Sequence, residues 1–286
     1  MNPTVIGPRT LEEALRALQD VTPDSRLLAG GTDLMVEIES GRTRPDAVID
    51  LWRVKELRYL RDEQGGLRIG ALSTCRDLLD SALARERADL LVLAADQVGA
   101  EQIKNRATLG GNLGTASPAS DLGPVLFALD ARVRLVSLRG ARELSIDEFW
   151  TGYRATARAS DELIESVFVP ARTPGERRGF RKVGTRAAQS ISKLVVAIVL
   201  RIDHGTLRGV RAGAGSIADK SLRLATLERE LEGQRPDAAT VERATRASAL
   251  ADARAIDDVR SSAAYRRRTL QRVMHTLIHE LIEGAR

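Results

Sequence analysis

The 286-residue sequence predicts an α+β fold made of three successive domains. Three observations support this prediction. Short apolar runs alternate with helical periodicity over residues 1–55, hairpin patterns flank an alanine-rich helical stretch over residues 56–172, and three sheet-like runs precede a long helical tail over residues 173–286. The first two domains are expected to be α/β units and the third a sheet followed by helices.

The first domain is predicted to alternate strands and helices in the order β-α-β-α-β. Residues 11–20 (LEEALRALQD) place apolar side chains at helical spacing. Residues 25–31 (SRLLAGG) are typical of a strand that ends at a glycine pair, and residues 33–41 of a helix closed by Gly41. Residues 46–51 (DAVIDL) then supply a further short strand.

Gly30 and Gly31 form the first candidate ligand site. Neither glycine has a Cβ, so the backbone can turn tightly and leave room for a bulky ligand. Thr32 or Asp33 is expected to cap the following helix. Free N–H groups would then converge on one point, which is a way to bind phosphate without a cationic side chain. A plain strand-to-helix turn is the alternative interpretation of this pair alone.

The second domain is predicted from two hairpins, a helical stretch and a strand. The hairpins lie at residues 57–72, around Gly65 and Gly66, and at residues 131–146, with a turn at Arg139 and Gly140. Residues 74–99 are expected to be helical, and residues 162–170 to form a strand that ends at a proline.

A second glycine-rich segment, residues 108–126, lies within this domain and is interpreted as a long polar loop before an apolar helix at residues 122–130. Long loops inside compact chains tend to be functional. The segment offers backbone donors, hydroxyl groups and one carboxylate, which suits a ligand with a diphosphate and a ribitol or ribose. A solvated helix-capping loop is the alternative. The polar and glycine residues concerned are Gly110, Gly111, Asn112, Gly114, Thr115, Ser117, Ser120 and Asp121.

The third domain is predicted to hold three strands and then three helices. The strands are expected at residues 178–184, 194–205 and 206–215, with a turn at His204 and Gly205. The helices are expected at residues 221–233, 238–251 and 262–284.

Composition excludes several classes of protein. The longest apolar runs fall well short of the ~20 residues of a membrane helix. One cysteine, Cys75, cannot form an intramolecular disulfide or hold an iron–sulfur cluster alone, and favours a reducing, cytoplasmic compartment. The net charge of +5 comes from basic residues interleaved with acids, without stacking aromatics, which argues against nucleic-acid binding.

Other possible sites are weaker. Residues 213–218 (GAGSIA) match GxGxxA, but no second strand with a ribose-binding acid follows, so a turn in a small-residue sheet fits better than a dinucleotide site. His275 and His279 lie four residues apart, yet Thr276 stands where a zincin has its glutamate. Cys75 is expected to pack at a helix start. We predict no metal site and no catalytic acid, base or nucleophile, as expected when a redox cofactor carries the chemistry.

Taken together, these segments resemble the FAD-binding (medium) subunit of molybdenum hydroxylases, the family of xanthine dehydrogenase and carbon monoxide dehydrogenase. The resemblance covers essentially the whole chain. It rests on residues 27–34 (LLAGGTDL), on residues 102–126 (QIKNRATLGGNLGTASPASDLGPVL), and on ELIESVFVP followed by GFRKVGTR. It implies a two-subdomain FAD-binding fold of the vanillyl-alcohol oxidase type, plus a C-terminal domain with a three-stranded sheet and a helical cluster.

The resemblance also assigns residues to the cofactor. The first segment would contact the FAD diphosphate through backbone N–H groups, and the second would line the diphosphate and flavin from the other side. Asp121 would bind near the ribityl or adenosine hydroxyls, and Ile164 and Lys182 would lie by the isoalloxazine ring, where Lys182 would stabilise negative charge. The full set is Leu27, Leu28, Ala29, Gly30, Gly31, Thr32, Asp33, Leu34, Thr108, Leu109, Gly110, Gly111, Asn112, Ser117, Asp121, Ile164 and Lys182.

The sequence departs from the family at two positions. Val98 stands where the xanthine dehydrogenase flavin domains have a phenylalanine beside the ring, which weakens any inference that NAD is the acceptor, and Ile164 replaces a leucine. The additional cysteines of the hydroxybenzoyl-CoA reductase branch are missing.

By resemblance, the chain is expected to be the FAD-binding electron-transfer subunit of a molybdopterin-dependent dehydrogenase. A large molybdopterin subunit and a small 2Fe-2S subunit would be its partners, in a dimer of heterotrimers. The electron acceptor would be NAD, a quinone or oxygen. A flavin-free scaffold subunit and a stand-alone FAD oxidase are the alternatives.

Overall fold

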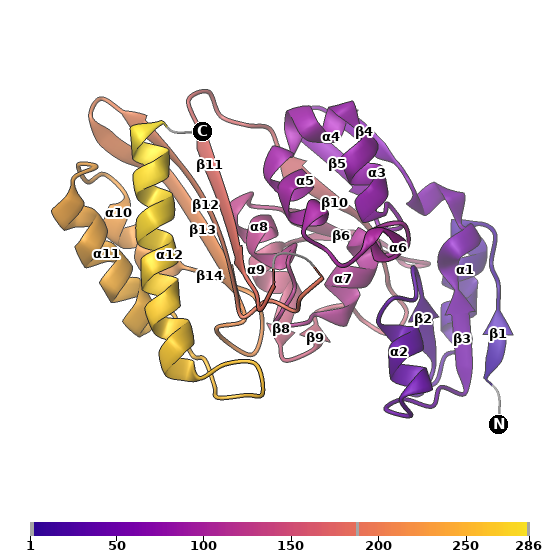
Figure 1. The fold of residues 1–286 in the computed structure, drawn as a ribbon. Helices are drawn as coiled ribbons and strands as arrows, with labels where there is room; N and C mark the ends of the chain where they lie inside the picture. Colours follow the sequence, from indigo (N-terminus) through magenta and orange to yellow (C-terminus); the bar gives the residue numbers. More distant parts are fainter. Residues whose placement is uncertain (1–2, 187–188, 285–286) are drawn as a thin grey trace.

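The computed structural model describes residues 3–186 and 189–284, and it confirms the mixed helix-and-sheet class (Figure 1). Three main sheets follow one another along the chain. The first lies at one end of the molecule, and the third lies toward the other end beside the long helix α12 (Ala263–Glu283). Within the described ranges, no helix is both long and apolar enough to cross a bilayer.

The first sheet is parallel and has the strand order β1-β3-β2. Val5 pairs with Val48, and Leu27 pairs with Ile49. The predicted alternation of strands and helices is found, because the order along the chain is β1 (Thr4–Ile6), α1 (Leu11–Ala17), β2 (Arg26–Leu28), α2 (Leu34–Glu39) and β3 (Ala47–Asp50).

The second sheet is antiparallel and has the order β4-β5-β10-β6-β7. Both predicted hairpins are present, and the strand that ends at Pro170 lies between them as the central strand. The strands are β4 (Leu60–Glu63), β5 (Gly66–Gly70), β6 (Arg132–Ser137), β7 (Gly140–Ser145) and β10 (Leu163–Pro170). A short helix and a two-stranded hairpin connect β7 to β10: α9 (Ile146–Phe149), β8 (Trp150–Gly152) and β9 (Ala155–Thr156).

The stretch at residues 74–99, predicted as one helical region, forms three short helices. They are α3 (Cys75–Asp80), α4 (Ala82–Arg87) and α5 (Asp89–Asp96), and α6 (Glu101–Lys104) follows. Ser81 interrupts the first pair because its backbone is extended and its hydroxyl accepts a hydrogen bond from the Ala84 N–H at 3.1 Å. A serine that caps the next helix in this way competes with helix continuation.

The third sheet has four strands, so the prediction of three was incomplete. Its order is β11-β12-β13-β14, with β11 (Arg177–Val183), β12 (Leu194–Asp203), β13 (Thr206–Gly215) and β14 (Leu222–Arg223). The two residues of β14 were predicted as the start of a helix. The turn at His204 and Gly205 is found, with positive φ at both residues. The helices are α10 (Ala225–Leu231), α11 (Ala238–Ala251) and α12.

Strand β12 joins the second and third domains because both of its faces are buried. Ala197 and Val199 pack in the same core as the helices of the second domain, whereas Val196 and Ile198 pack in the core under α10, α11 and α12. A strand buried on both faces reads as a continuous apolar run, which is the sequence pattern LVVAIVL of residues 194–200.

Helix α8 (Gly123–Ala128) fills the space beside this sheet, and all six of its residues are buried. A Cβ on Gly213 would overlap the carbonyl oxygen of Pro124, and one on Gly215 would lie 3.1 Å from the Pro124 Cγ. The GxGxxA match is therefore explained by close helix-on-sheet packing. β13 leads into bends and then β14, not directly into a helix.

Candidate functional site

The first glycine segment connects β2 to α2. Gly31 has φ +80°, a conformation that favours glycine. Asp33 occupies the N-cap position of α2, but its side chain makes no capping hydrogen bond, contrary to the expectation for Thr32 or Asp33. Within the described part of the chain, none of the backbone N–H groups of residues 29–34 has a protein acceptor. These donors are available to a ligand.

The second glycine segment is helical at its start, which corrects the prediction of a loop. Helix α7 spans Leu109–Thr115 and is capped by Thr108, whose Oγ1 accepts from the Gly111 N–H at 3.0 Å. Further tertiary bonds hold this glycine-rich turn, because Leu109 N–H donates to Ser73 O at 3.0 Å and Gly110 N–H to Ala71 O at 2.8 Å. Asn112 N–H donates to Thr108 O.

The two segments therefore differ in what they offer a ligand. The N–H groups of Leu109, Gly110, Gly111 and Asn112 are already used inside the protein, so these four do not supply the backbone donors expected from segment 108–126. This segment can instead offer a ligand two things: a glycine surface that has no side chains, and polar side-chain groups beside it. The Asn112 Oδ1 accepts from the Ser120 hydroxyl at 2.7 Å, which leaves the Asn112 amide donors for a ligand.

The two segments touch each other. A Cβ on Gly30 would overlap the backbone carbonyl oxygen of Arg106, and one on Gly111 would lie 3.8 Å from the Ala29 Cβ. Arg106 Nε also donates to the Gly30 carbonyl oxygen at 3.2 Å. The free N–H groups of the first segment thus lie beside the start of the second.

Asp121 and Lys182 form a buried ion pair, although 60 residues separate them in sequence. Lys182 Nζ, from β11, lies 2.6 Å from Asp121 Oδ2 and donates to the Gln97 carbonyl oxygen at 2.9 Å. Burial raises the pKa of Asp121 to about 6, although Lys182 opposes the shift. The Asp121 Oδ1 is buried without a hydrogen-bond partner in the described ranges. This oxygen can accept a hydrogen bond from a ligand hydroxyl.

The remaining predicted residues lie around these contacts. Ile164 lies in β10, and its Cδ1 would be 3.7 Å from a Cβ on Gly114 of α7. The Ser117 hydroxyl accepts from the Ala119 N–H at 3.3 Å, within the turn that follows α7. Val98 packs partly buried against the core of the second domain.

Two contributors were not predicted from the sequence. Gln97 acts through its backbone carbonyl, and no sequence pattern marks such a role. Arg106 is an exposed cation directly before the glycine-rich segment, and its guanidinium lies 3.7 Å from the centre of the Trp52 ring. The position of Arg106 within residues 102–126, the segment that carries the family resemblance, was the sequence feature that could have marked it.

The other candidate groups are not gathered into a metal-ligand cluster in the described ranges, because no three His, Cys, Asp or Glu side chains are grouped there as metal ligands. The rings of His275 and His279 lie next to each other on α12, tilted by 53°, with centres 4.4 Å apart. Cys75 is buried at the start of α3, as expected, and burial raises the pKa of its thiol to about 12. A thiol with this pKa is unreactive at neutral pH.

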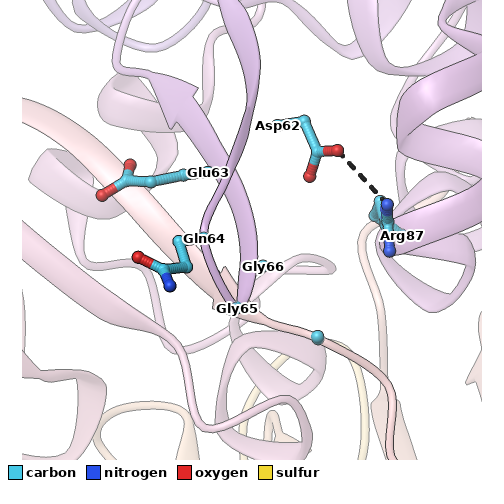
Figure 2. A pocket seen from close by; sticks show the side chains of 7 residues that line it. Asp62, Glu63, Gln64, Gly65, Gly66 and Arg87 are labelled. Carbon is cyan, nitrogen blue, oxygen red and sulfur yellow. Dashed lines mark hydrogen bonds and ion pairs between the residues drawn. The ribbon is translucent and has the colours of Figure 1, made fainter.

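A pocket of about 310 Å³ lies elsewhere, at the turn between β4 and β5 (Figure 2). Arg87 lies on one side of it, with its guanidinium 3.2 Å from Asp62. Its lining includes no residue of the two glycine segments: Asp62, Glu63, Gln64, Gly65, Gly66, Arg87 and Ala171. We therefore do not assign the cofactor to this pocket.

Comparison with protein families gives two matches that together span most of the chain. Residues 1–172 match the family described as FAD binding domain in molybdopterin dehydrogenase. The chain belongs to this family. Residues 179–281 match the family described as CO dehydrogenase flavoprotein C-terminal domain. Both findings confirm the resemblance seen in the sequence, and they identify FAD as the cofactor of the family and the chain as part of an oxidoreductase.

Individual relatives agree with this assignment. The chain is 37% identical over 203 residues to the nicotinate dehydrogenase FAD-subunit of Eubacterium barkeri, covering 69% of this chain and 68% of the relative. It is 30% identical over 276 residues to the nicotine 6-hydroxylase medium subunit of Paenarthrobacter nicotinovorans, covering 96% and 93%. A structure of carbon monoxide dehydrogenase from Hydrogenophaga pseudoflava superposes with a TM-score of 0.95 at 26% identity, covering 99% and 98%.

Proposed function

We propose that the chain is the FAD-binding electron-transfer subunit of a molybdopterin-dependent dehydrogenase. The observation that carries the proposal is the contact between the two glycine segments. It sets six N–H groups, which have no protein acceptor in the described ranges, beside Gly110 and Gly111 in the first turn of α7. This arrangement suits an extended ligand with a diphosphate. The family match supports FAD as that ligand.

Each part of the site has a proposed task. The backbone of residues 27–34 binds the diphosphate, and residues 108–112 together with Ser117 line the opposite side. The unpartnered Asp121 Oδ1 accepts a hydrogen bond from a ribityl hydroxyl, which would satisfy a buried acceptor that the protein leaves open. Ile164 and Lys182 border the ring.

Lys182 acts here as half of an ion pair. Because its ammonium lies 2.6 Å from the Asp121 carboxylate, much of its charge is compensated before any ligand binds. When bound, FAD supplies a carrier that exchanges electrons one or two at a time. Lys182 then holds the Asp121 carboxylate in place and keeps its ammonium group near the isoalloxazine ring.

We further propose partners and organisation. A large molybdopterin subunit and a small 2Fe-2S subunit would supply electrons, in a dimer of heterotrimers, with NAD, a quinone or oxygen as acceptor and a cytoplasmic location. Relatives named as FAD or medium subunits support the multi-subunit arrangement. We propose domain boundaries at residues 1–55, 56–172 and 173–286. Each range supplies most of one hydrophobic core, and the cores also share residues across these boundaries: Leu57, Leu72, Val136 and Leu163 pack in the first, and Ala197 and Val199 in the second.

Purification of the chain with and without its partners tests the proposal. We expect about one FAD for each chain, measured from the visible absorption spectrum, and copurification with molybdenum and iron–sulfur subunits. A colourless protein that FAD cannot reconstitute would support the scaffold alternative. Turnover of a substrate by the isolated chain would support a stand-alone oxidase.

A further inference from the structure

Arg106 is the one charged side chain that hydrogen-bonds to the Gly30–Gly31 turn in the part of the chain that the structure describes. Its Nε donates to the Gly30 carbonyl oxygen at 3.2 Å. Its guanidinium carbon lies 3.7 Å from the centre of the Trp52 ring, within the range of a cation–π contact. The side chain is therefore held at two points, one on the glycine turn and one on an aromatic face.

The hydrogen bond on the Gly30 oxygen also determines where the Gly31 N–H points. The two groups belong to one planar trans peptide unit, so they point in opposite directions. Gly31 has φ +80°, and a peptide between two glycines has few steric barriers against rotation. A donor that grips the carbonyl from one side therefore holds the N–H toward the other side.

The same bond strengthens the Gly31 N–H as a donor. A cationic donor on a carbonyl polarises the peptide, which makes its N–H a better hydrogen-bond donor. The Gly31 N–H is one of the six N–H groups that have no protein acceptor in the described ranges. Arg106 thus acts on the group that is open to a ligand.

We propose that Arg106 is a positioning residue for FAD, which fixes the Gly30–Gly31 peptide so that the Gly31 N–H faces the diphosphate. This inference rests on the proposed FAD site. The contact with Trp52 has its own task, because it holds the guanidinium beside the glycine turn, where Nε reaches the Gly30 carbonyl oxygen. A lysine has no planar fork and no Nε donor, so it cannot replace this geometry even though it keeps the charge.

The test measures FAD affinity of the full chain, stripped of flavin, by quenching of flavin fluorescence. Arg106→Lys and Arg106→Gln are each expected to weaken binding about tenfold, the effect of losing one charge-assisted hydrogen bond. Trp52→Leu is expected to weaken FAD binding several-fold. Trp52→Phe keeps an aromatic face, so its FAD affinity is expected to stay close to that of wild type. Arg61→Lys is the matched control, because Arg61 stacks on Tyr59 at 4.9 Å without contacting the glycine turn.

The outcomes separate this inference from the proposed function. If wild type binds FAD and Arg106→Lys binds it equally well, the positioning role is overturned and the proposed function stands. If Arg106→Lys retains affinity while Arg106→Gln loses it, charge alone acts and the peptide geometry does not, which also overturns the inference. If wild type takes up no FAD, both fail. Melting temperatures of the flavin-free Arg106 variants, measured alongside, should stay close to that of wild type, since Arg106 is exposed. A loss of affinity in these variants that follows a loss of folded protein would overturn the positioning role.

Discussion

Replacing Asp121 by Asn should change how the stability of the flavin-free protein depends on pH. Burial raises the pKa of Asp121 to about 6 in the folded chain, against 3.8 as its ordinary value. Between these two values the folded state holds the proton more tightly than the unfolded state. The carboxyl group therefore favours folding at low pH, and this contribution is lost as pH rises through 6.

The size of the effect follows from the shift. Ionising Asp121 in the folded chain costs about 3 kcal/mol over the full range, at about 1.4 kcal/mol for each pKa unit. Between pH 4.5 and 7.5 about two thirds of that range is crossed, so Asp121 should remove about 2 kcal/mol of stability. Asp121→Asn has no such titration. Its free energy of unfolding relative to wild type should therefore rise by about 2 kcal/mol over the same interval.

Urea denaturation at pH 4.5, 6.0 and 7.5, with and without Asp121→Asn, measures this difference directly. Groups that do not interact with Asp121 titrate alike in the two proteins and cancel in the difference. A pH-independent offset is allowed, because replacing the carboxyl group beside Lys182 by an amide shifts the stability equally at all three pH values. A difference between the proteins that does not change with pH, or that falls as pH rises, would refute the assignment of a raised pKa.

Three further substitutions test the packing and ion pairs around the site. Gly30→Ala places a Cβ on the Arg106 carbonyl oxygen, so it should lower stability by about 1–3 kcal/mol and also lower FAD uptake. Gly7→Ala is the control, because Gly7 has open space around it, and it should change neither the thermal melt nor the FAD titration. Gly213→Ala should destabilise the protein by ~1–3 kcal/mol, because the new methyl group meets Pro124. The control is Gly152→Ala, at an unobstructed site, and equal melting temperatures for the two variants would contradict this prediction. The Arg178 side chain is 3% exposed and pairs with Asp89 at 2.7 Å and with Glu176 at 3.0 Å. Arg178→Met should therefore lower the free energy of unfolding, measured by urea denaturation, by about 3–5 kcal/mol. A decrease below about 1 kcal/mol would show that these ion pairs do not stabilise the fold.

The sequence predicts those parts of the fold that depend on local patterns. The apolar run of residues 194–200 predicts a doubly buried strand, and Gly65 and Gly205 mark hairpin turns at the right places. Helix α7 escapes prediction because glycines disfavour helices, and this one is held by bonds to Ser73 and Ala71 from a distant part of the chain. Strand β14 escapes because two residues are too few to show a period.

The sequence predicts some parts of the candidate site and not others, because only local patterns can be read from it. The glycine pair and the second segment stand out in sequence, and the structure brings them into contact. Which of them still has free N–H groups depends on tertiary hydrogen bonds, so the donors expected at Gly110 and Gly111 are not available. The Asp121–Lys182 ion pair and the stack of Arg106 on Trp52 join residues from different elements, and no spacing rule encodes them.

The most direct test of the account is FAD uptake by the full chain carrying Gly31→Asp, compared with Gly41→Asp. Both glycines have positive φ, +80° and +71°, so both variants introduce backbone strain and the same charge, but only Gly31 lies in the proposed diphosphate turn. A Cβ on Gly31 also comes within 3.2–3.3 Å of the flexible Leu28 and Met35 side chains, whereas one on Gly41 meets no atom within 4 Å, so melting temperatures are compared alongside. We predict that Gly41→Asp binds about one FAD per chain, as wild type does, and that Gly31→Asp binds none at concentrations that saturate wild type. Equal FAD binding by the two variants would contradict the central claim that the Gly30–Gly31 turn holds the diphosphate.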